Sequence, residues 1–364
     1  MELESIINFF DNYTTLYHSD NRDYEQYISD VLKEYAQKIS DSSNLYGSSV
    51  AAFKLEEKEL TNTIITITEG LIEVVNYCSK YGIHDGVAYN KLTEVIDSTK
   101  LFYNYVKNFR TNDLTFFRLR KHDITSGKTG YERKELFHLP FQLSRDSSSM
   151  RYSPLGHPCL YLANSLYVGW EEVRKESNYY ACGMFENQDI LRLVELDSTP
   201  FCDRLKDFVN DNDKFDNLID YALLFPLTFA CSLIVKKDND KKPFKKEYLI
   251  SQLLLEYSRK KFDGIRYRST RIIGVDGFFW NYAIPTKEIG DIGYCPKLIK
   301  IFTMSEIVIF DFSEPLNISV FKDFAKNRDI AKVILNGNIY DFEKTAFAGM
   351  EYILATTPQK TDFA

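Results

Sequence analysis

The chain lacks the sequence patterns that bind metal ions or dinucleotides. It has five histidines in 364 residues, and no H-E-x-x-H motif or His/Cys cluster with metal-ligand spacing. No G-x-G-x-x-G stretch occurs, and the segment 126–129 (SGKT) fails as a phosphate loop because His122 stands where an earlier glycine is required. We therefore expect neither a Rossmann-type site nor a metal cofactor.

Paired cysteines and long apolar runs are also missing. No two cysteines form a C-x-x-C pair, and most of the six lie in apolar runs, which favours reduced core thiols in a reducing compartment. No apolar run approaches the roughly 18 residues that span a bilayer. The N-terminus has no basic segment before an apolar one. We expect a cytoplasmic protein without a membrane partner.

An excess of basic charge is absent as well. The formal net charge is −7, which argues against attraction to nucleic acid or to an anionic membrane. An anionic small substrate would need a locally basic pocket. Aromatic residues are abundant instead, with 25 tyrosines and 27 phenylalanines, so core and pockets should be aromatic-rich.

The hydrophobic periodicity divides the chain near residue 110. Apolar stripes with a period near 3.6 predict helices over 23–40, 52–81 and 89–109, hence a helical domain over 1–110. We expect this domain to serve packing, regulation or homo-oligomer formation. From Asp113 short strands predominate, and residues 111–310 are predicted to form a mixed α/β domain. Residues 311–364 are predicted to be an extension packed on it, so the fold class is α+β.

Within these parts the pattern predicts individual elements. Strands are expected over 115–119, 159–163, 190–196, 265–269 and 301–312, and helices over 214–220 and 247–261. Gly264 is expected to end the second helix in a left-handed cap conformation. Asn336-Gly337 predicts a late hairpin, followed by a helix over 342–354, and the lysine-rich segment 236–246 predicts a solvated loop.

The segment 151–175 combines a turn, a strand and a helix. Pro and Gly between residues 153 and 158 predict the turn, and Asn164 and Ser165 are good N-caps for the helix that follows. The unit brings Arg151, Tyr161 and Glu172 to fixed geometry. Taken singly, each has an ordinary interpretation: Arg151 as a solvated charge, Tyr161 as a core ring, and Glu172 as part of an exposed helix face.

The combination of motifs resembles the RES family, named for an arginine, a glutamate and a serine. The motifs that carry the resemblance are Phe117-Arg118-Leu119-Arg120, His138-Leu139-Pro140-Phe141, Arg151-Tyr152-Ser153-Pro154 with Leu160-Tyr161 and Glu172-Val173, and Phe262-Asp263-Gly264 with Ser269 and Asn281. The Arg151-to-Glu172 offset of 21 residues matches the family spacing. The resemblance implies a small fold related to ADP-ribosylating toxins, and an enzyme that degrades NAD.

The resemblance also implies roles for residues. The catalytic set is Glu172, Arg151, Tyr161 and Ser269. The NAD-binding set is Arg118, Arg120, Tyr152, Arg271 and Asn281. A carboxylate stabilises the positive charge that develops on the ribose as nicotinamide leaves, and arginine clamps phosphate. Arg151 is the first candidate for the clamp, and Arg118 or Arg120 the second.

Strand alternation refines the expected serine site. Ile265, Tyr267 and Ser269 should share one face of their strand, with Arg266 and Arg268 on the other. Arg271 should return to the site from the loop that follows. If the helix register is off by one residue, Glu171 replaces Glu172.

The acceptor of the ADP-ribosyl group stays open at this point. Water gives an NAD glycohydrolase, inorganic phosphate an NAD phosphorylase, and a protein side chain an ADP-ribosyltransferase. A non-catalytic interaction module that kept the fold is a further alternative. The resemblance favours depletion of free NAD, in a toxin-like or phage-defence role restrained by an inhibitory antitoxin or regulatory protein.

Overall fold

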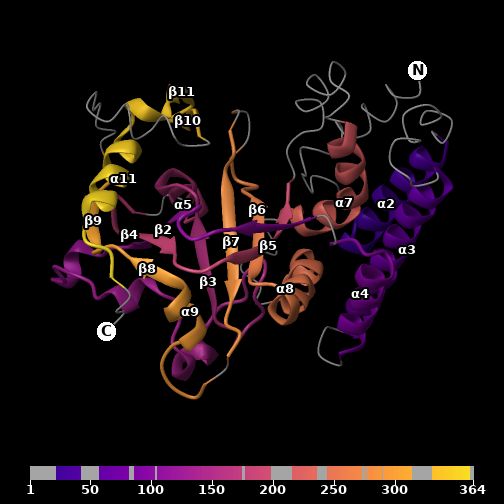
Figure 1. Ribbon diagram of the computed structural model, residues 1–364, viewed down its shortest axis with the longest axis horizontal. Coiled ribbons are helices and arrows are strands. Elements are labelled where there is room, and N and C mark those ends of the chain that lie inside the picture. The colour runs from indigo at the N-terminus through magenta and orange to yellow at the C-terminus, as the bar shows by residue number, and fades with distance from the viewer. Residues whose placement is uncertain are drawn as a thin grey trace. The chain divides into compact units, whose positions relative to one another are not determined.

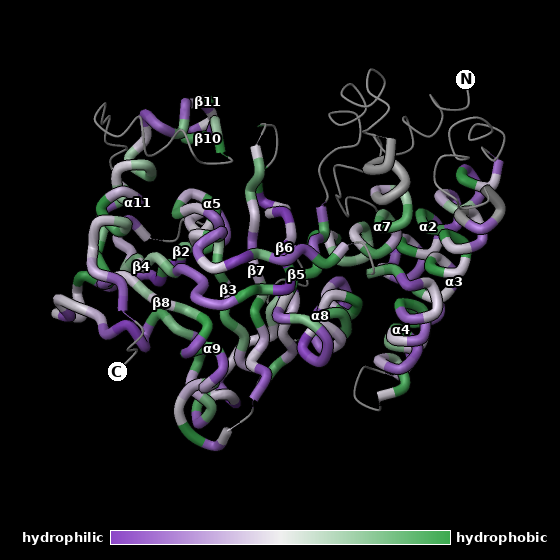
Figure 2. Tube along the Cα trace, in the orientation of Figure 1, coloured by the Kyte–Doolittle hydropathy of each residue, from purple (hydrophilic) through white to green (hydrophobic). Residues whose placement is uncertain are grey.

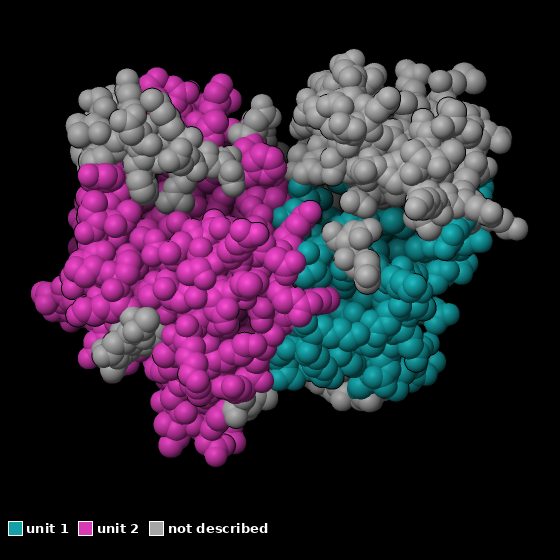
Figure 3. Space-filling model, viewed as in Figure 1, with its two compact units in different colours: residues 1–106, 148–155, 194–261 teal, residues 107–147, 156–193, 262–364 magenta. Residues whose placement is uncertain are grey.

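The computed structural model describes residues 22–41, 57–81, 86–102, 105–173, 177–197, 215–235, 244–272, 275, 277–288, 290–313 and 330–360. They form two compact units (Figure 3). Unit 1 comprises residues 1–106, 148–155 and 194–261, and unit 2 comprises 107–147, 156–193 and 262–364. Two segments from inside the expected second domain thus join the N-terminal helices, and the expected limits at residues 110 and 310 stay a prediction. No described helix is long and apolar enough to cross a membrane.

Unit 1 is helical. Its helices are α2 (Tyr24–Asp41), α3 (Glu57–Tyr81), α4 (Val87–Ser98), α7 (Phe215–Ser232) and α8 (Leu249–Lys261). The apolar stripe of α2 is buried, and Tyr35 donates a hydrogen bond of 2.6 Å to the Ala222 carbonyl of α7. The periodicity therefore predicted correctly that these segments form helices. The lysine-rich segment lies outside the described residues as far as position 243.

The third predicted helix is wrong in its second half. The helix α4 ends at Ser98, because Thr99 caps the Val95 carbonyl and Lys100 takes a left-handed conformation with φ 51°. Residues Val106–Phe109 form the strand β1 instead. A β-branched valine and a phenylalanine suit a pleated strand as well as a helix, so periodicity alone did not separate the two.

Unit 2 is built on a mixed sheet with α5 (Leu166–Glu172), α9 (Pro296–Ile301) and α11 (Ala346–Thr356) (Figure 1). The remaining strands are β2 (Thr115–Lys121), β3 (Cys159–Ala163), β4 (Tyr179–Asn187), β5 (Leu191–Leu196), β6 (Gly264–Arg268), β7 (Trp280–Pro285), β8 (Phe302–Met304) and β9 (Val308–Asp311). Their order is β1-β5-β6-β7-β3-β2-β4-β8, with β9 also on β4. The predicted α+β class is confirmed.

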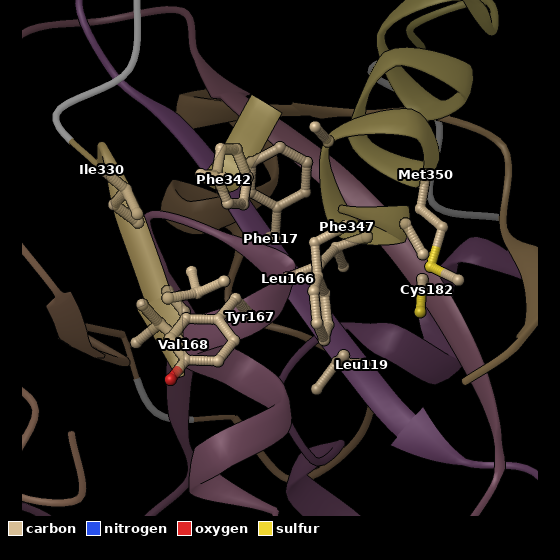
Figure 4. Close-up of a cluster of buried hydrophobic side chains, with 14 of the residues drawn as sticks. Phe117, Leu119, Leu166, Tyr167, Val168, Cys182, Ile330, Phe342, Phe347 and Met350 are labelled. Atoms are coloured by element: carbon tan, nitrogen blue, oxygen red, sulfur yellow. The ribbon is translucent and has the colours of Figure 1, made fainter. Parts of the chain in front are cut away.

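Two core clusters cover the two faces of this sheet. Alternating residues of β2 enter different clusters, Phe117 and Leu119 one and Phe116 the other. The first cluster contains α5 and α11 and is called the α5-side core (Figure 4). Both hydrophobic and hydrophilic stretches occur along the strands (Figure 2). The strands β2 and β3 share a single register pair, Phe117 with Ala163. This pair joins the longer ladders that β2 and β3 each form with their other neighbours.

The expected strand over 301–312 is two strands. Both pair with β4, β8 at its end and β9 at its start. Ser305 interrupts them, because its amide bonds to the Met184 carbonyl and its Oγ accepts from the Met184 amide at 2.9 Å. The late hairpin is confirmed as β10 (Lys332–Leu335) and β11 (Asn338–Asp341), with Asn336 and Gly337 both at positive φ.

The expected left-handed cap at Gly264 is wrong, since Gly264 begins β6 in an extended conformation. A Cβ there would lie 2.6 Å from the Ala283 carbonyl oxygen of β7. We expect Gly264→Ala to lower the free energy of unfolding by about 1–3 kcal/mol through overpacking. Gly130→Ala is the control, because nothing lies within 4 Å of its added Cβ. Equal urea midpoints for the two variants would contradict this steric account.

Candidate active site around Glu172

The short helix α5 carries Glu172 at its last position. Ser165 is the N-cap, and its Oγ accepts from the Tyr167 amide at 3.1 Å. A Cβ on Gly169 would lie 3.1 Å from Leu119 and 3.8 Å from Ala163, so the helix packs closely on β2 and β3. The expected strand, cap and helix are confirmed, with Ser165 as the capping residue.

The carboxylate of Glu172 is held by three donors. Its Oε1 accepts from Ser269 Oγ at 2.7 Å and from Asn281 Nδ2 at 2.8 Å. Its Oε2 accepts from Arg271 Nε at 3.1 Å. The side chains of Glu172 and Arg271 are 33% and 37% exposed. A fixed carboxylate that a ligand can still reach is the central feature of this arrangement.

The strand register explains why these residues meet. Asn281 of β7 pairs with Ala163 of β3 on one side and with Tyr267 of β6 on the other. Directly paired residues point to the same face, which is the face that α5 covers. Ser269 follows Tyr267 by two positions, and its amide donates to the Phe279 carbonyl at 2.8 Å. The expected alternation along β6 therefore agrees with this geometry.

Arg271 reaches the cluster from the loop after β6, as the sequence predicted. Its amide also donates to Ser269 Oγ at 3.3 Å. Glu172, and not the neighbouring Glu171, accepts the three hydrogen bonds. The helix register expected from the sequence needs no shift.

Tyr161 lies on the same sheet face. It pairs with Ala283, two positions along β7 from Asn281, and is half-buried. Its ring is therefore placed on the side of the sheet that carries the carboxylate cluster.

Arg118 and Arg120 lie on the opposite face of β2 from Phe117 and Leu119. Burial and the neighbouring Arg120 lower the pKa of Arg118 to about 9. Its buried Nη1 has no hydrogen-bond partner among the described residues. Arg120 donates to the Phe137 carbonyl at 3.5 Å, and burial lowers its pKa too. Alternation places both arginines on the face of β2 opposite Phe117, while Arg118 stays close enough to Tyr161 for the tyrosine to act on its pKa.

Arg151 and Tyr152 belong to unit 1. Arg151 Nη1 donates to the carbonyls of Cys231 and Leu233 at 2.9 and 2.8 Å, and its guanidinium lies 5.2 Å from the Tyr248 ring. Tyr152 is 1% exposed. In this structure the first holds the end of α7 and the second is a core ring.

Two motif residues have a structural use that the sequence did not reveal. Asn164, expected as a cap, donates to the Phe278 carbonyl at 2.6 Å and accepts from the Trp280 amide at 3.0 Å. It thereby fixes the entry to β7 beside α5. His138 is fully buried, with Nδ1 2.7 Å from the Leu139 carbonyl and Nε2 accepting from the Cys295 amide. Burial lowers its pKa to about 4.

The cluster offers one carboxylate, and no group of three His, Cys, Asp or Glu side chains that could hold a metal occurs among the described residues. Its groups instead suit a ligand with hydroxyls and negative charge. Serine and asparagine side chains can form hydrogen bonds with hydroxyls, and an arginine can pair with phosphate. The arrangement is that of a compact polar site on a mixed α+β domain.

Comparison with known proteins identifies the class to which this domain belongs. Residues 117–299, half of the chain, match the RES domain, and the chain belongs to the RES domain family. The chain is also similar to a protein of Bacillus subtilis (strain 168) named Putative toxin YopC, at 28% identity over 349 residues. That match covers 91% of this chain and 74% of the relative. No solved structure matches.

Proposed function

We propose that this chain is a toxin-type enzyme that cleaves the bond between nicotinamide and ribose in NAD. The observation that carries the proposal is the Glu172 carboxylate, fixed by Ser269, Asn281 and Arg271 although these residues lie 97 to 109 positions away in sequence. The name of the Bacillus subtilis relative supports the toxin role.

The proposed chemistry needs one well-placed negative charge. Positive charge develops on the ribose as neutral nicotinamide leaves, and a carboxylate beside the ribose stabilises the transition state more than the ground state. Because the leaving group is already cationic in NAD, no second carboxylate is needed as a strong general acid. Glu172 is the one carboxylate among the four side chains of the cluster.

The partners of Glu172 also have proposed roles toward the substrate. Ser269 and Asn281 hold the carboxylate, and their proposed second role is to bond to ribose hydroxyls. Arg271, partly exposed and paired with Glu172, is the proposed partner of the pyrophosphate. Tyr161 offers a ring for nicotinamide. Arg118 and Arg120, on β2 of the same unit, remain candidates for the outer phosphates.

The proposed role is tested by inducible expression of the full chain in a bacterial host. We expect growth arrest preceded by loss of cellular NAD, and neither effect with Glu172→Gln. Arrest with an unchanged NAD pool would refute NAD depletion, and a labelled protein target would then favour the transferase. Product analysis with and without inorganic phosphate separates hydrolysis to ADP-ribose from phosphorolysis.

A variant that adds a second carboxylate tests the charge of Glu172. Asn281→Asp places an acid 2.8 Å from Glu172 Oε1, and two carboxylates this close resist ionising together. We expect the acidic limb of the kcat–pH profile to move upward by about one pH unit or more. Asn281→Ala removes the hydrogen bond without adding charge and should move the limb upward by less than Asn281→Asp does. Identical profiles for the two variants would contradict the requirement for an ionised Glu172.

A further inference from the structure

The helix α5 is too short to fix its own position. It has seven residues, about two turns, and ends at Glu172. Helices of this length are marginal in isolation, so their position comes from tertiary contacts. The contacts that hold α5 therefore decide where the Glu172 carboxylate lies.

A buried carboxylate caps the first turn of α5. Glu351 of α11 is fully buried, and its Oε1 accepts from Ser165 Oγ at 2.8 Å and from the Leu166 amide at 2.7 Å. The Ser165 hydroxyl in turn accepts from the Tyr167 amide. Helix N-termini carry amides without intrahelical partners and favour negative charge, so Glu351 satisfies this end of α5 from another element.

The segment 330–356, called the C-terminal segment, holds α5 at two more points. The Tyr167 hydroxyl donates to the Ile334 carbonyl at 3.3 Å and accepts from its amide at 3.2 Å. The ring of Phe347 lies 5.4 Å from the rings of both Tyr167 and Trp170. Figure 4 shows Leu166 and Tyr167 in one cluster with Phe347. None of these partners lies in the matched range 117–299.

We propose that Glu351 is a positioning residue for the reaction, acting through α5 on Glu172. The inference rests on the proposed NAD cleavage. By fixing the first turn, Glu351 sets the rotation and depth of α5, and thus keeps Glu172 within 3.1 Å of Arg271 and 2.7 Å of Ser269. A displacement of about 1 Å in such a site lowers the rate by up to 10²-fold. Glu351 therefore acts on the reaction from outside the matched range, through its two hydrogen bonds to the first turn of α5.

The test compares three variants of the full chain for nicotinamide release. Glu351→Ala removes the cap and should lower kcat by about 10- to 100-fold with little change in KM. Glu351→Gln keeps an acceptor oxygen and should recover part of that loss. Met350→Ala is the matched control, because it removes a neighbouring buried side chain of α11 and none of the hydrogen bonds to α5. Its kcat should stay close to wild type at a temperature where all variants are folded.

Hydrogen exchange of the Leu166 and Tyr167 amides provides a readout independent of catalysis. It should accelerate in Glu351→Ala and stay unchanged in Met350→Ala. A wild-type kcat in Glu351→Ala, or an equal loss in Met350→Ala, would overturn the proposal. If the wild type releases no nicotinamide, the proposed function fails. Exchange at α5 then decides the positioning role alone, and unchanged protection in Glu351→Ala overturns it.

Discussion

Replacing Glu172 by glutamine is expected to lower kcat for NAD cleavage by about 10²–10³-fold, equivalent to about 2.7–4 kcal/mol of transition-state stabilisation. Glutamine keeps the size of the side chain and an acceptor for Ser269. It removes the negative charge that opposes the oxocarbenium-like ribose. KM should change little, because the interaction is made mainly in the transition state.

The neighbouring Glu171 provides the control for this variant. Glu171→Gln removes the same charge from the same helix, one position away from the hydrogen-bonded cluster. We expect it to retain a rate close to wild type in a nicotinamide-release assay. Equal losses in the two variants would indicate a general effect of helix charge and would contradict the assignment of Glu172.

Replacing Asp263 by alanine is expected to lower the free energy of unfolding by about 3–5 kcal/mol, the usual loss when one partner of a buried ion pair is removed. Asp263 precedes β6, and its side chain is 12% exposed. It accepts from Lys287 Nζ at 2.7 Å and from the Arg192 amide at 3.0 Å. The substitution leaves the lysine, 19% exposed, without its carboxylate.

The pH dependence of this loss follows from the sign of the pKa shift. Burial alone would raise the pKa of Asp263, but its donors outweigh burial and hold it below the ordinary value of 3.8. Burial lowers the pKa of Lys287 even though Lys287 is paired with Asp263. The loss of stability at acidic pH is set by Asp263, whose carboxylate has more than one hydrogen-bond donor. A lowered carboxyl pKa stabilises the fold above the unfolded pKa and loses effect as pH falls through the folded pKa.

Urea denaturation of wild type and Asp263→Ala checks both points. The difference in the free energy of unfolding between the two proteins should be complete at neutral pH and shrink as the pH falls through the unfolded pKa of 3.8 toward the lower folded pKa. Asp341→Ala is the control, because Asp341 pairs with Lys344 on the surface with its side chain 46% exposed. We expect Asp341→Ala to lower the free energy of unfolding by far less than Asp263→Ala does. A loss at Asp263 no larger than at Asp341 would refute the buried-pair account.

The local parts of this site could be predicted from sequence because they depend on neighbouring residues. A serine before an apolar helix predicts the cap at Ser165, and alternation along β6 separates Ser269 from Arg268. The pairing of Glu172 with Ser269 came from the family motifs, since no local rule relates residues 97 positions apart.

The remainder depended on long-range packing. Alternation in β2 shows that Arg118 and Arg120 share a face, but the pairing of Phe117 with Ala163 decides which face that is. Glu351 looks like an ordinary helical charge in sequence, and only the docking of α11 on α5 reveals its buried contacts. The sequence alone suggested that Gly264 caps a helix. In the structure a glycine is required there because the backbone of Ala283 approaches it closely.

The amount of nicotinamide released when the purified full chain is incubated with NAD measures the proposed cleavage itself. We expect one nicotinamide for each NAD lost, at a rate that Glu172→Gln lowers by about 10²–10³-fold and Glu171→Gln leaves nearly unchanged. NAD that stays intact in the presence of the wild type, or equal rates of release by wild type and Glu172→Gln, would contradict it.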